Sequence, residues 1–214
     1  MAKNDKDKQK QHAEILKGAV DDFDKFEDFF TSNIKNILIG FAVAALIITV
    51  TAIGYSKYQQ SVIAKSAELT TAKTVEELEA VIKKYPQINA VYPAKMRLAT
   101  LFFNSAKYEK ASALYKELAS TAPVGEIRNR ARLNEAYTLE AMNKSLPAAA
   151  LFAAIGMDAS LPAYIKDEAN YSAARIYAAA KKNDKAKSCA KAINLSTSGS
   201  FWAMQGQKLL QRLN

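Results

Sequence analysis

The chain has 214 residues, a formal net charge of +9, 50% apolar residues and 24% charged residues. This balance excludes a chain that is disordered throughout. Seven glycines and five prolines are few for a protein of many short strands and tight turns, so the composition predicts an all-α fold.

The counts of reactive side chains argue against an enzyme. The chain has one cysteine, Cys189, and one histidine, His12, which cannot form a metal site made only of these residue types. The glycines form no phosphate-binding pattern, and Cys189 has no histidine base on its own side of the apolar segment described below. We predict no catalytic residue, no metal site and no cofactor.

The N-terminal 36 residues divide into two parts. Residues 1–19 are polar, charged and without periodicity, which predicts a disordered tail. In residues 20–36, phenylalanines recur at helical spacing with acidic residues between them, which predicts an amphipathic helix. Its apolar face has two alternative contacts, the membrane interface and a partner protein, and its acidic face disfavours anionic headgroups.

Residues 37–55 form the one long apolar run, ILIGFAVAALIITVTAIGY, with no charged residue. A helix of this length is about 28 Å long and matches the hydrocarbon core of a bilayer. A buried helix of a soluble bundle is the alternative. A cleaved signal peptide is disfavoured because 36 residues precede the run. We therefore predict one uncleaved transmembrane helix.

Charge does not decide the orientation of this helix. Three lysines lie within about twenty residues on each side, so the positive-inside rule gives a tie. The first 36 residues have seven lysines and eight acids, and the part after residue 55 therefore carries a net charge of about +10. A basic domain of this kind suits anionic lipid surfaces or acidic partners. Nucleic acid is disfavoured because the cations are dispersed and no nucleic-acid module is present.

The helical domain is predicted to cover residues 56–214. Its first helix covers roughly residues 56–72, and the second opens on a capping box formed by Thr74 and Glu77. Next comes the stretch LATLFFNSAKYEKASALYKELASTAP, which begins at Leu98 and predicts two antiparallel helices. The last segment, from Phe201, predicts a terminal helix that covers the open end of the domain.

Small and aromatic residues recur at fixed spacing in this domain. Ala99 and Ala111 are twelve residues apart, and so are Ala174 and Ala186. Between these pairs lies a weaker copy, for which we assign Leu133, Tyr137, Ala150 and Pro162, with Pro147 opening its second helix. The residues predicted to pack between helices are Ala99, Phe102, Tyr108, Ala111, Tyr115, Pro123, Ala174, Tyr177 and Ala186.

This helical pattern, with a period in the mid-thirties, resembles the tetratricopeptide repeat, although Ala106 stands where that family has a turn glycine. The resemblance implies a solenoid of about three hairpins whose first helices line a concave surface. Projection of the repeat places these residues on the concave, partner-binding surface: Met96, Thr100, Phe103, Asn104, Glu135, Tyr171 and Arg175.

The order of charged tail, FFTSNIK, single anchor and divergent repeats resembles a bacterial family of membrane-anchored proteins that includes an ancillary subunit of the Sec translocon. This resemblance implies a cytoplasmic N-terminus, an inner-membrane anchor and a periplasmic helical domain. It implies a scaffold or chaperone-like adaptor that binds envelope proteins or exported chains. The alternative is a cytosol-facing basic solenoid that recruits acidic partners or nucleic acid.

Overall fold

The computed structural model describes residues 2–193 and 201–213, with side chains from residue 21 onward. The described residues form helices and no strands, which confirms the all-α prediction. The helices are α1 (Ala2–Thr71), α2 (Val75–Lys84), α3 (Val91–Asn104), α4 (Tyr108–Thr121), α5 (Glu126–Ala141), α6 (Ser145–Met157), α7 (Ala163–Ala179), α8 (Asn183–Lys191) and α9 (Phe201–Leu213).

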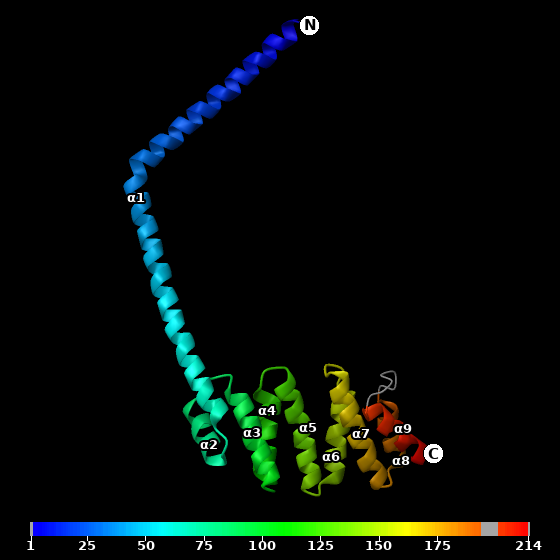
Figure 1. Cartoon of the computed structure of the whole chain (residues 1–214). Coiled ribbons are helices and arrows are strands. Elements are labelled where there is room, and N and C mark those ends of the chain that lie inside the picture. Colours follow the sequence, from blue (N-terminus) through cyan, green and yellow to red (C-terminus); the bar gives the residue numbers. More distant parts are fainter. Residues whose placement is uncertain (1, 194–200, 214) are drawn as a thin grey trace. The chain divides into compact units, whose positions relative to one another are not determined.

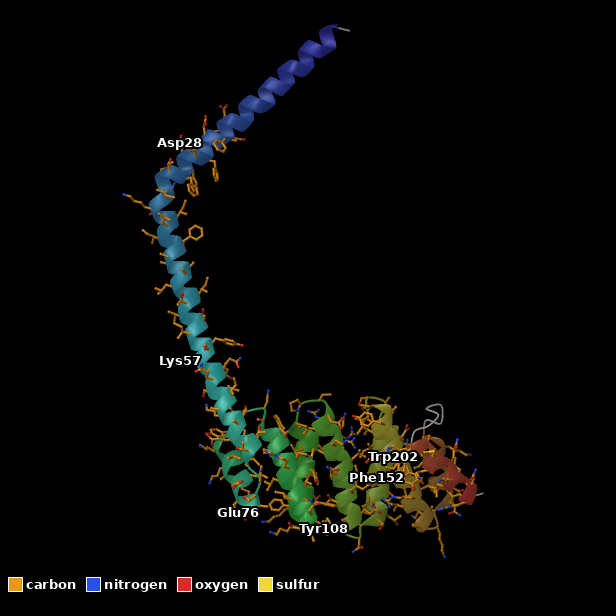
Figure 2. All side chains as sticks on the ribbon, in the orientation of Figure 1. Asp28, Lys57, Glu76, Tyr108, Phe152 and Trp202 are labelled. Carbon is orange, nitrogen blue, oxygen red and sulfur yellow. The ribbon has the colours of Figure 1, made fainter. Side chains whose placement is uncertain are left out.

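The chain divides into two compact units, Met1–Ser61 and Val62–Asn214. The described residues of the first unit all lie within α1. This helix contains the one stretch in the described residues that is long and apolar enough to cross a membrane. Figure 2 shows the side chains between Asp28 and Lys57 projecting outward from the helix. No residue between 38 and 55 is buried.

The structure differs from the sequence prediction before the apolar run, because α1 begins at Ala2 and includes the tail predicted to be disordered. That tail contains good helix formers and no proline, so polarity alone did not interrupt the helix. The polar stretch at residues 31–33 is also helical. There, Thr31 Oγ1 donates to the carbonyl of Glu27 at 2.8 Å, and Asn33 Nδ2 donates to the carbonyl of Phe29 at 2.9 Å.

The second unit begins inside α1. The last turns of α1 contact α2, where Glu68 of α1 is paired with Lys84 of α2 at 2.8 Å. The predicted capping box is present: the Glu77 amide donates to Thr74 Oγ1 at 3.2 Å, and the Thr74 amide donates to a Glu77 carboxylate oxygen at 3.2 Å. Leu69 and Leu78 are fully buried and join the core of the following hairpin. The predicted helix end near residue 72 agrees with the observed end at Thr71.

Three helical hairpins follow, α3–α4, α5–α6 and α7–α8, and their turns have the same backbone geometry. Ala106, Asn143 and Lys181 have φ values of 56°, 62° and 57°. The next residue of each turn, Lys107, Lys144 or Lys182, donates its amide to a carbonyl five residues earlier at 2.8 to 2.9 Å. The three turns are therefore copies of one structure.

The buried alanines show the same repeat. The pairs Ala99 and Ala111, Ala136 and Ala148, and Ala174 and Ala186 are each twelve residues apart, and all six alanines are fully buried. Ala136 lies 37 residues after Ala99 and 38 residues before Ala174. The assignment of Ala150 to the second unit was therefore wrong by two positions, since Ala150 is exposed and Ala148 fills the packed position.

Within the second unit, each helix packs mainly against its neighbours in the chain, and α3, α5 and α7 also contact one another in sequence (Figure 1). The helix α9 packs on α7 and α8, as the prediction of a terminal covering helix requires. On α9, Ala203 and Gly206 are buried, Trp202 and Leu213 are partly buried, and Phe201 is exposed. A Cβ at position 206 would lie 2.6 Å from Ile193 Cδ1, so the end of the Ile193 side chain would have to shift.

Candidate functional site

A groove of ≈ 570 Å³ lies over the adjacent helices α3 and α5, with one residue from α4. Its volume is in the range of ligand-binding clefts. The lining residues combine aromatic, amide, hydroxyl and carboxylate groups: Thr100, Phe103, Asn104, Tyr115, Asn134, Tyr137, Glu140 and Ala141.

The floor of the groove near α3 is a small polar network. Tyr115 is only 2% exposed, and its hydroxyl lies 3.2 Å from Thr100 Oγ1. The side chain of Asn134 is a second hydrogen-bond partner of this hydroxyl. Burial raises the pKa of the Tyr115 hydroxyl, so the group stays neutral at physiological pH. The network holds the groove open with groups that are already hydrogen-bonded.

Tyr137 forms the aromatic wall on α5. Its ring packs edge-on against the fully buried Phe152 with 4.8 Å between centroids. Its hydroxyl donates to Glu168 Oε1 at 3.0 Å and lies 3.2 Å from Ser172 Oγ. Burial raises the pKa of Tyr137 to about 12. These contacts bind α5 to both α6 and α7, so the wall is rigidly positioned.

Glu140 closes one end of the groove by pairing with Arg175 of α7. The two guanidinium nitrogens Nη1 and Nη2 donate to the two carboxylate oxygens at 2.5 and 2.6 Å. This bidentate pair raises the pKa of the Arg175 guanidinium. Glu140 and Arg175 also line a second hollow of ≈ 370 Å³ beside α7. The charges here are matched, so this end of the groove carries little net charge.

Four of the predicted partner-binding residues line these hollows. Thr100, Phe103 and Asn104 line the groove, and Arg175 lines the second hollow. Met96 on α3 contacts α5, since its sulfur is 3.8 Å from Asn134 Nδ2. It also lines a smaller hollow together with Arg97. The structure thus places part of the predicted surface in one continuous region over α3, α5 and α7.

Two other predicted binding residues lie elsewhere. The ring of Tyr171 packs against Trp202 of α9 at 5.5 Å, so the terminal helix covers it. Glu135 does not line the groove; it is partly buried, and this burial raises the pKa of its carboxyl group above the ordinary value. Its place in the 37-residue repeat corresponds to the buried Leu98. The incorrect assignment of Glu135 follows from the wrong alignment of the second hairpin.

Sequence reasoning missed Asn134, Tyr137 as a groove residue, Glu140 and Ala141. The repeat step would have found them, because Tyr137, Glu140 and Ala141 lie 37 residues after Thr100, Phe103 and Asn104. The position of Asn143 in the turn was the signal for this alignment, since asparagine accepts the left-handed conformation more readily than most residues.

The predicted packing residues are mostly in the core. Buried positions are Ala99, Phe102, Ala111, Tyr115, Ala174, Tyr177 and Ala186. Tyr108 is half-buried and contacts Phe103 edge-on at 5.5 Å between centroids, so it supports a groove residue. Pro123 is exposed in the connection after α4, whereas its neighbour Ala122 is fully buried. Pro123 therefore follows the helix end without packing in the core.

In the described part of the chain, no group of three or more His, Cys, Asp and Glu side chains is placed to hold a metal ion. Cys189 is half-buried, and burial raises the pKa of its thiol, which disfavours the reactive thiolate. The groove offers rings, amides and a closed ion pair. These groups suit recognition of a neutral or weakly charged ligand with hydrogen-bonding groups.

No family model, curated protein or solved structure gives a significant match to this chain.

Proposed function

We propose that this protein is a single-pass membrane protein whose helical domain is a tetratricopeptide-like solenoid that captures segments of other polypeptides. The observation that carries the proposal is the groove on the inner helices of aligned hairpins. The three turns and the three alanine pairs repeat at steps of 37 and 38 residues, as solenoid repeats do. The sequence resemblance to tetratricopeptide repeats supports the same assignment.

The groove chemistry supports a polypeptide ligand. Phe103 and Tyr137 provide rings for apolar side chains, and Asn104 and Asn134 provide amide groups that pair with an extended backbone. The Glu140–Arg175 pair is internally satisfied. A segment with apolar or aromatic side chains and low charge would fit this surface better than a polyanion.

The anchor would increase the effectiveness of this binding. A domain tethered to a membrane meets membrane partners at a raised effective concentration, so weak contacts in the groove suffice. Following the family resemblance, we place the N-terminus in the bacterial cytoplasm, the anchor in the inner membrane and the domain in the periplasm. The protein would then act as a scaffold or chaperone-like adaptor for envelope proteins or exported chains, including clients of the export machinery.

Site-specific photocrosslinking in the full-length protein tests the groove. A photoreactive amino acid at Asn104 should capture polypeptides in membranes, whereas the same group at Ala150 should capture few, because Ala150 is exposed on α6 outside the groove. Phe103→Ala in the same chain should reduce capture at position 104. Equal capture at positions 104 and 150 would refute the groove as the binding surface.

The orientation has a separate test. A reporter that is active only in the periplasm, fused after Asn214, should be active in cells. Activity only of a cytosol-dependent reporter at that position would overturn the proposed topology and leave the groove proposal standing.

A further inference from the structure

The two ends of the helical unit differ in their connections. We define the loop end by the longer connections at residues 85–90, 122–125 and 158–162, and the turn end by the tight turns at residues 105–107, 142–144 and 180–182. Because consecutive helices are antiparallel, each type of connection lies at one end of the row (Figure 1). The part of α1 that belongs to this unit runs from Val62 to the α1–α2 connection, so the chain enters the unit at the loop end.

Exposed large hydrophobic residues are concentrated at the loop end. Among the described residues of the unit, seven are of this kind, and three lie in or within one turn of the loop-end connections: Val124, Met157 and Tyr164. Ile63 stands one residue after the chain enters the unit, Phe201 and Met204 are on α9, and Leu146 is at the turn end. Val124 and Met157 are 85% and 79% exposed.

Core packing does not account for this distribution. Single exposed hydrophobic residues are ordinary on protein surfaces, but here two of the three loop-end connections carry them, Val124 within 122–125 and Met157 and Tyr164 beside 158–162. Val124 follows the buried Ala122 and the exposed Pro123, and Met157 follows the buried Ile155 by two residues.

The chain itself keeps the loop end close to the membrane. Six residues separate Tyr55, the last residue of the apolar run, from Val62. Even fully extended, six residues span only about 20 Å. The entry point of the domain therefore stays within this distance of the lipid surface, whatever angle the domain adopts.

We propose that the loop end of the helical domain rests on the membrane interface, with Val124 and Met157 inserted among the lipid headgroups. This inference rests on the proposed membrane anchor. Interfacial binding of this type depends on buried apolar area and on cations that meet anionic lipids. At the loop end, Arg130 and Lys84 are already paired with Glu126 and Glu68 at 2.7 and 2.8 Å. The proposal assigns the contact to the apolar side chains, so zwitterionic lipid suffices for it.

The turn end has the opposite character. Lysines occupy the turns themselves, at Lys107, Lys144, Lys181 and Lys182, and each is exposed. With the loop end on the lipid, these cations point away from the bilayer. The domain would then stand on the membrane with a fixed face toward it, and its groove would open parallel to the membrane surface.

Fluorescence quenching in vesicles tests this placement with the full-length protein. Single cysteines, Val124→Cys or Met157→Cys, are introduced together with Cys189→Ala and labelled with an environment-sensitive fluorophore. A label at Ser105→Cys, exposed at the turn end, is the matched control. The proteins are reconstituted into phosphatidylcholine vesicles with and without lipids that carry a quencher near the headgroup. We expect strong quenching and a blue-shifted emission at positions 124 and 157, neither at position 105, and no loss of the difference at high salt.

The outcomes separate this inference from the proposed function. If the chain floats with the vesicles but positions 124 and 157 are quenched no more than position 105, the loop end does not contact lipid and only this inference fails. A difference that disappears at high salt would assign the contact to charge and overturn the apolar mechanism. If the chain does not float with vesicles at all, the membrane anchor fails and this inference fails with it. A second variant, Val124→Asp with Met157→Asp, should make residues 56–61 of α1 more susceptible to protease while the vesicles remain bound.

Discussion

Replacement of Ala106 by glycine should stabilise the helical domain. Ala106 has a φ of 56°, which is the left-handed region. For a residue with a Cβ, the steric cost of this conformation is roughly 1–2 kcal/mol, whereas glycine has no such cost. Glycine loses more backbone entropy on folding, at a cost of about 0.5–1 kcal/mol. We therefore expect Ala106→Gly to raise the free energy of unfolding by about 0.5–1 kcal/mol.

The repeated turns provide matched comparisons for this prediction. Lys181 has a φ of 57° and the same turn hydrogen bonds, so Lys181→Gly should give a similar gain. Asn143 has a φ of 62°, but asparagine is tolerated in this region. Asn143→Gly should consequently change stability little. The expected order is therefore a gain at positions 106 and 181 and almost none at position 143.

The single tryptophan makes the measurement specific to the domain. Trp202 lies on α9 and contacts Tyr171 of α7, so its fluorescence reports loss of the helical packing and not of α1. Denaturant unfolding of the full-length protein in detergent should show these changes in unfolding free energy. In thermal unfolding, a gain of 1 kcal/mol corresponds to about 2–4 °C in Tm for a domain of this size. If Ala106→Gly loses stability, or if Asn143→Gly gains as much as Ala106→Gly, the reasoning is wrong.

Three further predictions follow from the core and from the charged connections. Phe152→Ala removes a fully buried ring that packs on Tyr137 and should lower the unfolding free energy by about 3–5 kcal/mol in the same assay; a loss no larger than that of Met157→Ala, an exposed control, would contradict the assigned core. Tyr137→Phe keeps that ring contact but removes the hydroxyl that donates to Glu168, so it should lower the unfolding free energy by about 1 kcal/mol. A loss as large as that of Phe152→Ala would contradict the assignment of the effect to one hydrogen bond. Hydrogen bonds from Ser160 and then Arg132 lower the pKa of Asp158 from 3.8 to about 2, so its contribution is present above about pH 4 and disappears as the pH falls toward 2; Asp158→Asn should flatten the pH dependence of stability in this window, and an unchanged slope would contradict the shift.

Local sequence patterns predicted the parts of this fold that depend on neighbouring residues. The capping box of α2 and the end of α1 need only residues a few positions apart, and both agree with the prediction. The twelve-residue alanine spacing predicted the first and third hairpins, because an aromatic residue, Phe102 or Tyr177, follows the first alanine of each pair by three positions.

The second hairpin was misaligned because α6 has no polar face to mark its register. Its sequence, SLPAAALFAAIGM, contains five alanines, and any of several could be the packed one. The choice of Ala150 over Ala148 shifted the whole unit and moved Glu135 into the predicted binding set. In the structure, α6 is covered by α5 and α7, so its composition reflects burial on two sides instead of amphipathicity.

Tyr171 lies outside the groove because of long-range packing. Its place in the repeat corresponds to Met96, which lies beside the groove, and nothing local distinguishes the two. The difference is that α9 folds back onto α7 and brings Trp202 against Tyr171. The inner surface of the last hairpin is therefore partly used for closing the domain.

The repeat also explains why the groove has its observed position along the row. The position of Thr100 becomes Tyr137 in the second hairpin and Arg175 in the third, and the position of Phe103 becomes Glu140. The inner surface thus changes from aromatic and amide groups over α3 to a charged pair beside α7. Because Arg175 is held by both oxygens of Glu140, an acidic ligand would have to displace a bidentate partner before it could bind there. Under the proposed function, an apolar segment placed over α3 and α5 would meet no such competitor.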